Sequence, residues 1–560
     1  MKVARAIHGL AVAAAAMTAL LALGVSQATA VPQPLIPTTL VKYLEPLPIP
    51  PAAQETAPGY YEMSMNQGTT QFHPALPPTT VWGYNDGFHA NGYLGPTFLV
   101  RRGEDIHVQW TNNLPLAHIL ADSIDYTLDG AMQGPDVRAV THLHGGHVAD
   151  TSDGGPDDWV VPGGSKTYEY PNDQDATMLW YHDHAVGITR LNPYAGLAGA
   201  YVVRDGYEDA LNLPGGPSDP GSFEVPLVIQ DKMFTVDTET NQSFLGYPTE
   251  GDLPWLHPTW VPEFFGDTMV VNGKIWPYLQ VEPRKYRFRI LNGSNARFYS
   301  LKLAGTRGGH SVVPTIFQIG AEGGLLPAVA PISQLLIAPG ERADVIVDFS
   351  QLAGTTLVLR NGAKAPYPAG ESPNSHTTNQ ILQVRVDLPL SHPDNSVIPA
   401  NPRPITRLDP AQAAATRDVK MTEELDVATG EPMVLKLEGK GYRDPVTLTP
   451  TLGTTEVWRF INTTGDTHPM HLHLVQFQVL DRQNFDVARY LASGQLRFTG
   501  NRRAPDANEM GWKDTVRVNP GEVVRIIANF DHVGTYPVHC HILEHEENEM
   551  MRPFQVLPAP

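Results

Sequence analysis

Two short features recur three times along this chain at nearly equal intervals. An alternating, apolar, strand-like segment ends at Asn112, Asn292 and Asn462, at intervals of 180 and 170 residues. Each segment is followed by a Pro-Gly pair, and each pair precedes another strand-like run. The pairs are Pro162-Gly163, Pro339-Gly340 and Pro520-Gly521, at intervals of 177 and 181 residues. Two independent markers with nearly the same long period predict three copies of one domain.

Each copy has a composition that favours strands and turns over long helices. The 560 residues include 49 glycines and 51 prolines, and helical periodicity is sparse. A copy of about 170–180 residues with these properties predicts a β-sandwich or a Greek-key barrel with long loops. The expected fold class is therefore all-β, with domains over residues 31–207, 208–387 and 388–560. The proline-rich stretch 389–404 is expected to act as a linker.

The start of the chain has the pattern of an export signal. Lys2 and Arg5 form a basic head, residues 9–24 are apolar, and Ala28-Thr29-Ala30 is a small-residue cleavage site. We expect a signal peptide over residues 1–30 and a secreted or periplasmic mature chain. An uncleaved anchor is the alternative, although the apolar run is short for a membrane span.

Composition and charge exclude two classes of partner. No later stretch has 18 consecutive apolar residues, so we expect no membrane insertion after the signal. The 39 basic and 59 acidic residues give a formal charge of −20, which disfavours nucleic acid and anionic membranes. Cys540 is the single cysteine, so the chain forms no internal disulfide. We expect the mature chain to be a monomer.

Ten of the 21 histidines fall in four short motifs. These motifs are His142-Leu143-His144, His182-Asp183-His184, His468-Pro469-Met470-His471-Leu472-His473, and His539-Cys540-His541 with His545. Residues i and i+2 of a strand point to the same face, so each His-x-His pair presents two imidazoles side by side. That arrangement suits a metal cluster. Scattered histidines are expected on the surface or in a satisfied core; they include His73, His107, His257 and His310.

The repeat register matches the motifs of the first copy to those of the third. The later His pair follows the Pro-Gly glycine by 19 residues in the first copy, from Gly163 to His182, and by 18 in the third, from Gly521 to His539. Each of these copies contributes four matched histidines, whereas the middle copy has none near residues 357–360. We expect the first and third copies to face each other across a shared metal cluster, with the middle copy as a spacer.

The third copy also carries a second set of candidate ligands, which includes sulfur atoms and suits a soft metal ion. These are His468, Cys540, His545 and Met550. Two imidazoles, a thiolate and a thioether form the ligand set of a blue-copper site. A zinc site is the alternative, and Met551 could replace Met550. Because strand neighbours face opposite sides, Cys540 would serve this site while His539 and His541 face the shared cluster, which predicts a short covalent path for electrons.

These motifs resemble the four copper signatures of the multicopper oxidases, in particular the branch of bacterial spore-coat laccases and bilirubin oxidases. The matching strings are THLHGG at 141–146, WYHDH at 180–184, HPMHLH at 468–473 and VHCHILEH at 538–545. The resemblance extends from about residue 40 to the C-terminus. It implies three cupredoxin-like Greek-key barrel domains and four copper ions: one type 1, one type 2 and two type 3.

The resemblance also implies how the ligands are divided. The residues that resemble type 1 ligands are His468, Cys540, His545 and Met550. The residues that resemble the type 2 pair are His142 and His471. The residues that resemble the type 3 set are His144, His182, His184, His473, His539 and His541. The repeat register finds the same twelve residues but does not separate type 2 from type 3.

The function implied is that of an exported laccase-like oxidase. It would oxidise phenols or aromatic amines one electron at a time at type 1 copper and reduce O₂ to water at the trinuclear cluster. Oxidation of bilirubin, Mn(II) or an aminophenol is the alternative within the family. A copper-binding electron-transfer or storage protein is the alternative of another class. The export signal argues against a spore-coat role, and the dispersed methionines argue against a cuprous oxidase.

Reduction of O₂ to two waters consumes four protons, so acidic groups are expected near the cluster. Asp153 and Glu546 match acidic positions of this branch and are expected to deliver protons; solvated loop carboxylates are the alternative. Cys540 is expected to conduct the electrons. Asp183 is expected to orient neighbouring histidines. His147 has no counterpart in the third copy and is expected to be structural.

Overall fold

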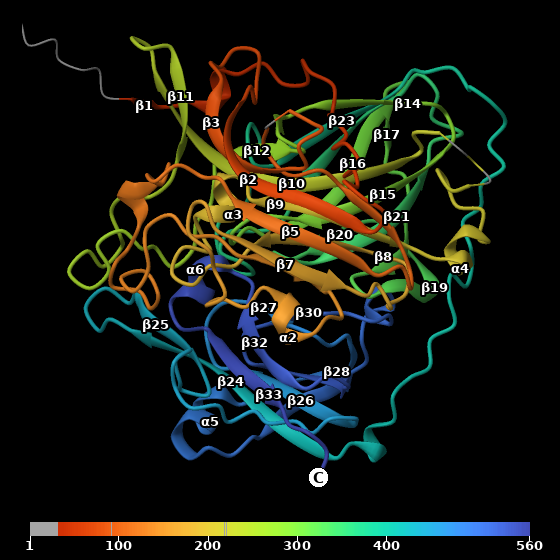
Figure 1. Cartoon of the computed structure of the whole chain (residues 1–560). Coiled ribbons are helices and arrows are strands. Elements are labelled where there is room, and N and C mark those ends of the chain that lie inside the picture. The colour runs from red at the N-terminus through yellow and green to blue at the C-terminus, as the bar shows by residue number, and fades with distance from the viewer. Residues whose placement is uncertain (1–31, 91, 218, 220) are drawn as a thin grey trace, which may run out of the picture.

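The computed structural model describes residues 32–560 apart from residues 91, 218 and 220 (Figure 1). The predicted signal peptide, residues 1–30, lies outside the described residues. The described chain consists mainly of strands, which form three consecutive units of paired sheets, and the all-β prediction is confirmed. Within this described part, no helix has the length and apolar character needed to cross a membrane.

The first unit packs two sheets around an aromatic core. One layer contains β2 (Tyr60–Thr70), β3 (Thr79–Asn85), β5 (Ile106–Asn112) and β7 (Ser165–Tyr170). The other contains β4 (Phe98–Arg101), β9 (Ala198–Arg204), β8 (Thr177–Asp183) and β6 (Thr141–His144), in that order. The rings of Tyr84, Trp110 and Tyr181 lie between the layers with centroids 5.0–5.4 Å apart. The loops contain α2 (Asp150–Asp153) and α3 (Asn192–Ala195).

The middle unit shares a sheet with the first. Its large layer contains β10 (Glu224–Asp237), β12 (Thr268–Val271), β13 (Lys274–Ile275), β15 (Lys285–Asn292), β18 (Ile316–Ala321), β19 (Gly324–Ile332) and β21 (Arg342–Asp348). The second layer contains β14 (Tyr278–Val281), β16 (Tyr299–Arg307), β17 (His310–Val312), β20 (Leu335–Ile337), β22 (Thr356–Asn361) and β23 (Gln380–Val386). Strand β11 (Gln242–Gly246) pairs with both β10 and β3, so one 13-stranded sheet, which also includes β1 (Gln33–Pro34), crosses both units. Helix α4 (Gly206–Asp209) precedes this unit.

The third unit forms a separate sandwich. One sheet runs in the order β25 (Pro432–Leu437), β24 (Ala415–Leu425), β26 (Thr454–Asn462), β31 (Glu522–Phe530), β28 (Phe477–Phe485) and β29 (Phe498–Arg503). The other runs in the order β30 (Thr515–Val518), β27 (His468–Leu472), β32 (Gly534–Cys540) and β33 (Met551–Val556). The helices are α5 (Val487–Ser493) and α6 (Leu543–Glu547). In Figure 1 this unit, in blue, lies below the other two, and α2 of the first unit contacts β32.

The same three-strand arrangement recurs in each unit. A parallel pair, β2–β5, β10–β15 or β24–β26, is extended by an antiparallel strand, β7, β21 or β31. The two sequence markers meet at one turn in every unit. The Pro-Gly amide donates to the Asn carbonyl oxygen at 2.7 Å for Gly163 and Asn112, 3.0 Å for Gly340 and Asn292, and 3.2 Å for Gly521 and Asn462. The markers therefore recur because each closes the same turn against the same strand end.

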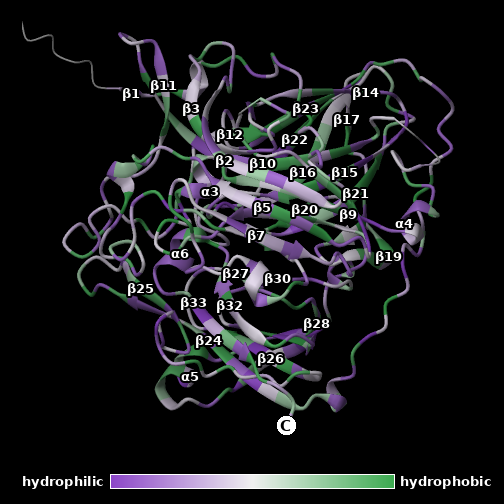
Figure 2. Cartoon of the chain, in the orientation of Figure 1, coloured by the Kyte–Doolittle hydropathy of each residue, from purple (hydrophilic) through white to green (hydrophobic). Residues whose placement is uncertain are grey.

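Burial follows the alternation of the strands. Figure 2 shows apolar colouring concentrated on the strands inside the layers and polar colouring on many peripheral loops. Strand β5 has the pattern expected of a sheet with one covered face, since Ile106, Val108 and Trp110 are buried while His107 is exposed. Strand β8 is buried along its whole length, because it lies where the first unit meets the others.

Candidate metal centre

The four histidine motifs lie on the facing surfaces of the first and third units. Within each unit the paired strands set the imidazoles side by side: His142 opposite His182, and His471 opposite His539. Between units the rings stack, with centroids 3.7 Å apart for His142 with His473 and for His144 with His471. All eight predicted cluster histidines are buried. The structure thus brings them together across the two units, in the face-to-face arrangement expected from the repeat.

Three of these imidazoles point nitrogen atoms at one another. Nε2 of His539 lies 3.3 Å from Nε2 of His184 and 3.2 Å from Nε2 of His473. The Nδ1 atoms of two of them face hydrogen-bonded oxygens: Asp153 Oδ2 at 2.7 Å from His473 and the Cys540 carbonyl at 3.0 Å from His539. Nδ1 of His184 lies 3.3 Å from Glu546 Oε1 but forms no hydrogen bond with it. In His473 and His539 Nδ1 then carries the ring hydrogen, so their Nε2 lone pairs converge beside Nε2 of His184. A bound cation between them would replace this repulsion with coordination.

The other five imidazoles also present a free nitrogen to the cluster. Among the described residues, no hydrogen-bond partner exists for Nε2 of His142, His182 and His471, Nδ1 of His144, or either nitrogen of His541. Oxygens hold the opposite nitrogens: the Asp153 carbonyl for His142, the Asp183 carbonyl for His182, the Asp514 carbonyl for His471 and the Asp514 carboxylate for His144. Burial lowers the pKa of all five rings well below the usual value, which favours the neutral form that binds metals. The donor set therefore fits a cluster of imidazole-bound copper ions.

A second cluster surrounds the single cysteine. Cys540 Sγ lies 3.6 Å from Nδ1 of His468 and 3.8 Å from Nδ1 of His545, and these two nitrogens are 3.2 Å apart. The Thr464 hydroxyl lies 2.6 Å from Nε2 of His468 and leaves Nδ1 free. Burial lowers the pKa of His468 to about 3 and raises the pKa of the Cys540 thiol well above its usual value. A cation beside the sulfur is therefore needed to hold it as a thiolate.

Strand pairing separates the two candidate methionines. Met551 lies directly opposite His539 in the β32–β33 pair, and the Cys540 amide donates to the Met550 carbonyl oxygen at 3.0 Å. Opposed residues of an antiparallel pair share one face of the sheet. Met551 therefore shares the face of His539, and Met550 shares the face of Cys540. Both methionines are buried, and this pairing favours Met550 as the thioether beside the sulfur.

Asp153 reaches the cluster from the end of α2. Its Oδ2 lies 2.7 Å from Nδ1 of His473, and its Oδ1 lies 3.5 Å from Nδ1 of His142. Burial raises the pKa of Asp153 well above its usual value, and the charges of Asp150 and Asp158 raise it further. This carboxyl group can therefore hold a proton next to the cluster.

Glu546 reaches the same imidazoles from α6. Its Oε2 lies 3.0 Å from Nδ1 of His539 and its Oε1 lies 3.3 Å from Nδ1 of His184. Asp183 has a different position, because its carboxylate accepts from the amides of Val140 and Ala185. Asp183 therefore fixes the backbone beside the histidines, whereas Glu546 contacts the rings.

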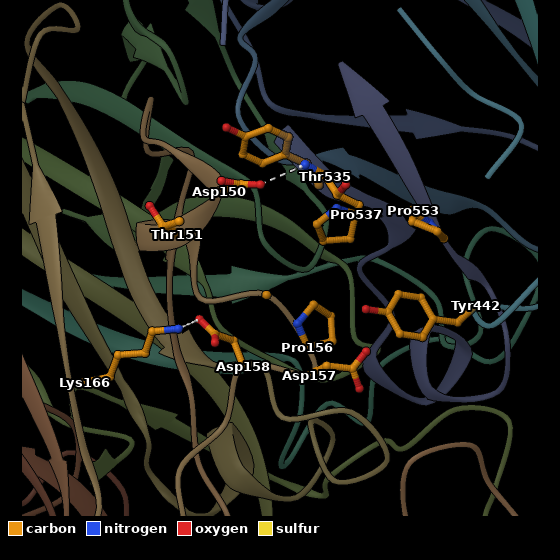
Figure 3. A pocket seen from close by; sticks show the side chains of 12 residues that line it. Asp150, Thr151, Pro156, Asp157, Asp158, Lys166, Tyr442, Thr535, Pro537 and Pro553 are labelled. Atoms are coloured by element: carbon orange, nitrogen blue, oxygen red, sulfur yellow. Dashed lines mark hydrogen bonds and ion pairs between the residues drawn. The ribbon is translucent and has the colours of Figure 1, made fainter. Parts of the chain in front are cut away.

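A pocket of about 460 Å³ opens between α2 and strands β32 and β33. Figure 3 shows Asp150, Asp158 and Lys166 of the first unit facing Thr535 and Pro537 of the third. Asp150 accepts from the Thr535 amide at 3.1 Å, and Lys166 forms an ion pair with Asp158. Asp150 and Asp158 line this pocket, and their charges act on the buried Asp153.

Two residues that contact the proposed ligands, and a third that supports one of these two, are missed by the sequence analysis. Thr464 binds His468, Asp514 binds both His144 and His471, and Arg342 of the middle unit forms an ion pair with Asp514. Thr464 lies two residues after the repeat asparagine Asn462. The repeat therefore predicts the turn that contains Thr464, but it does not predict the contact with His468. No sequence pattern places Arg342 beside Asp514, because the contact joins segments 172 residues apart.

Comparison with known proteins assigns the family. Family models described as multicopper oxidase match residues 133–208 and 404–560. A laccase of Bacillus subtilis is 44% identical over 537 residues, covering 92% of this chain and 99% of that protein. The chain belongs to the multicopper oxidase family. A laccase of Haloferax volcanii is 39% identical over 92% of this chain and 86% of that protein. The McoA multicopper oxidase of Aquifex aeolicus superposes with a TM-score of 0.70 at 29% identity, covering 92% of this chain and 100% of that chain.

Membership of this family confirms several predictions made from the motifs. The chain is a laccase-like oxidoreductase with cupredoxin-like β domains and copper as its cofactor. The family therefore favours the enzyme over the electron-transfer or storage alternative, and copper over zinc at the Cys540 cluster.

Proposed function

We propose that this multicopper oxidase is an exported laccase that takes single electrons from phenols or aromatic amines and reduces O₂ to water. Four donor molecules each lose one electron, and one O₂ gains four electrons and four protons to give two waters. The copper ions would supply the electron acceptor and the site of O₂ reduction. The observation that carries the proposal is that the end of β32 serves both clusters. Cys540 belongs to the thiolate cluster, and its neighbours His539 and His541 belong to the histidine cluster shared by the first and third units.

The proposal assigns four copper ions to twelve residues. The thiolate site, type 1, is His468, Cys540, His545 and Met550. The type 2 ligands are His142 and His471. The type 3 ligands are His144, His182, His184, His473, His539 and His541. The bare nitrogens and the short distances between these rings support the assignment, and the division into types rests on the family motifs.

The residues of the chain supply the path for electrons and the protons. The backbone joins Cys540 directly to His539 and His541, so the two sites are linked through a few covalent bonds. Asp153 would hold a proton at the carboxyl that faces His473, and protons would reach it from the pocket that Asp150 and Asp158 line beside α2. Glu546 places its carboxylate 3.0 Å from Nδ1 of His539 and 3.3 Å from Nδ1 of His184, on the side of each ring opposite to Nε2.

The proposal is tested by copper content and oxygen consumption. Purified wild-type enzyme is expected to hold four coppers, to be intensely blue and to consume O₂ with a syringyl phenol. Cys540→Ser should lose the blue colour, one copper and O₂ consumption, whereas His310→Gln, on an exposed strand of the middle unit, should retain all three. A wild-type enzyme with fewer than four coppers, or an active Cys540→Ser enzyme, would contradict the proposal.

The Mn(II) alternative has one observation in its favour. Burial together with the charges of Asp466, Glu544 and Glu423 raises the pKa of Glu263 well above its usual value, and the charge of Glu263 in turn acts on Cys540. Glu263 and Glu544 both act electrostatically on Cys540, and a cation bound near these carboxyl groups would relieve their mutual repulsion. Glu263→Gln should slow Mn(II) oxidation while leaving the rate with a syringyl phenol unchanged. A Glu263→Gln enzyme that oxidises Mn(II) at the wild-type rate, or that loses rate equally with both donors, would contradict a cation site.

Export and oligomeric state form a further part of the proposal. The basic head, apolar run and cleavage site support removal of residues 1–30 and a secreted or periplasmic enzyme. The mature chain is proposed to act as a monomer. N-terminal sequencing of the exported protein should begin near Val31, and light scattering should give the mass of one chain.

A further inference from the structure

The middle unit touches the copper centre although it supplies none of the twelve proposed ligands. Its turn at Pro339-Gly340 packs against the ring of His541, and a Cβ placed on Gly340 would lie 2.7 Å from His541 Cδ2. Gly340 also has a φ of +79°, which disfavours other residues. Since neither nitrogen of His541 has a hydrogen-bond partner among the described residues, this packing helps to hold its ring.

Two residues after this glycine, Arg342 crosses from the middle unit to the third. Its Nη1 lies 2.8 Å from Asp514 Oδ1 and its Nη2 lies 2.5 Å from Asp514 Oδ2, a two-bond ion pair in which both side chains are buried. The same guanidinium donates to the carbonyl oxygens of Met178 in the first unit, at 3.1 Å, and of Gly340, at 3.1 Å. Arg342 therefore joins all three units at one point.

Asp514 in turn binds two proposed copper ligands, one through its carboxylate and the other through its backbone carbonyl. Its Oδ1 lies 3.1 Å from Nε2 of His144, and its backbone carbonyl lies 2.9 Å from Nδ1 of His471. Each of these ring nitrogens donates its hydrogen to oxygen, so the other nitrogen is bare: Nδ1 in His144 and Nε2 in His471. Asp514 thus selects opposite tautomers in two stacked imidazoles.

Gly145 lies directly against the ion pair of Arg342 and Asp514. A Cβ at this position would lie 2.4 Å from Asp514 Oδ2 and 2.6 Å from Arg342 Nη2. The glycine that follows His144 therefore leaves room for the ion pair to reach the cluster.

We infer that Asp514, fixed by Arg342 of the middle unit, is a positioning residue that determines which nitrogen His144 and His471 present to copper. This inference rests on the proposed copper assignment and deepens it. The middle unit is then a structural part of the trinuclear centre as well as a spacer. Without Arg342, the Asp514 carboxylate is a buried anion without its cation and no longer has a fixed orientation.

The inference predicts a local defect in the cluster. Loss of groups that orient metal-bound histidines commonly lowers metal affinity or activity by about 10–100-fold. Arg342→Met should lower kcat by about that factor and alter or remove the type 2 copper signal in electron paramagnetic resonance. The blue colour of the thiolate site should persist, because neither His144 nor His471 contacts it. Arg342→Lys keeps the charge but loses the two-bond geometry, so its effects should be smaller.

A matched control separates positioning from general destabilisation. Arg289 is another buried arginine of the middle unit, paired with Glu208 and Glu224. Arg289→Met should lower stability but leave the type 2 spectrum of the folded enzyme unchanged. The inference is overturned if Arg342→Met retains the wild-type type 2 signal and kcat, or if Arg289→Met alters both equally. Fewer than four coppers in wild-type enzyme would instead contradict the copper assignment itself.

Discussion

The Asp153 carboxylate lies 2.7 Å from Nδ1 of His473, although 320 residues separate them in the chain. Asp153 comes from α2 of the first unit and His473 follows β27 of the third. The contact joins the two units at the cluster, and it places an acid whose pKa is raised by burial beside the imidazoles. The same residue can therefore orient a ligand and supply protons.

Asp153→Asn should keep the hydrogen-bonding shape but remove the proton. We expect kcat for O₂ consumption to fall by about 100-fold, as is usual for loss of a general acid. Reduction of the blue copper by a phenol under anaerobic conditions should be unchanged, because that step requires no proton at the cluster. Stopped-flow absorbance and an oxygen electrode measure the two steps separately.

The control for this substitution is a buried carboxylate elsewhere. Asp231 in β10 binds Arg297 at 2.7 Å and contacts no proposed ligand. Asp231→Asn should lower thermal stability without changing kcat of the folded enzyme. If Asp153→Asn turns over O₂ at the wild-type rate, the role assigned to Asp153 is wrong.

Thr464→Val should weaken copper binding at the thiolate site. The hydroxyl lies 2.6 Å from Nε2 of His468 and keeps Nδ1 directed at Cys540. Loss of such a support typically lowers metal affinity by about 10-fold or more. Loss of blue colour during titration with a chelator measures the change.

The neighbouring threonine offers a matched comparison. The Thr463 hydroxyl donates to the Met421 carbonyl oxygen at 2.6 Å and not to a histidine. Thr463→Val should leave chelator resistance at the wild-type level. Equal loss of copper in both variants would show that the effect of Thr464→Val is structural.

Much of the site could be predicted because its ligands lie in short motifs. His142 and His144 are two residues apart on one strand, so strand geometry alone makes them neighbours. The repeat register then relates them to His471 and His473, and the structure stacks these rings across the interface. The repeat itself could be predicted from the sequence because Asn112 and Gly163 close a turn that recurs in each unit.

The supporting contacts could not be predicted in this way. Arg342 and Asp514 belong to different units and have no shared spacing, and only the folded chain brings them together. The sheet that crosses the first two units could not be predicted either, because it depends on the pairing of Ser243 with the distant Thr79. Periodicity shows which face a residue occupies but not which distant segment covers it. The domain boundaries near residues 207 and 387 stay predictions.

Met550→Leu should raise the reduction potential of the thiolate-site copper. A thioether donates weakly to the metal and favours the oxidised state, and leucine removes the donor at nearly constant volume. Redox titration of the blue colour measures the potential. Met551→Leu is the control, because Met551 shares the face of His539 and not that of Cys540. A shift in Met551→Leu with none in Met550→Leu would reverse the assignment.

His147 joins the first and third units outside the cluster. Its Nδ1 lies 2.8 Å from Asp173 and its Nε2 lies 3.0 Å from Asp531, while the ring of His532 faces it with centroids 4.5 Å apart. Burial would lower the pKa of His147, but the hydrogen bonds to the two carboxylates outweigh it and raise the pKa to about 10. The structural role expected for His147 therefore takes the form of an ion-pair bridge between units.

His147→Gln should destabilise the enzyme in a pH-dependent way. The pKa of His147 is higher in the folded state than the value of about 6.5 expected after unfolding, so its contribution is complete below about pH 6.5 and disappears as pH rises through about 10. The difference in unfolding free energy from wild type should be on the order of 1 kcal/mol near pH 6, since both aspartates are partly exposed, and close to zero above pH 10. Denaturant unfolding of wild type, His147→Gln and the exposed control His376→Gln at both pH values measures this difference. A destabilisation that is the same at both pH values would show that His147 contributes through packing and not through its charge.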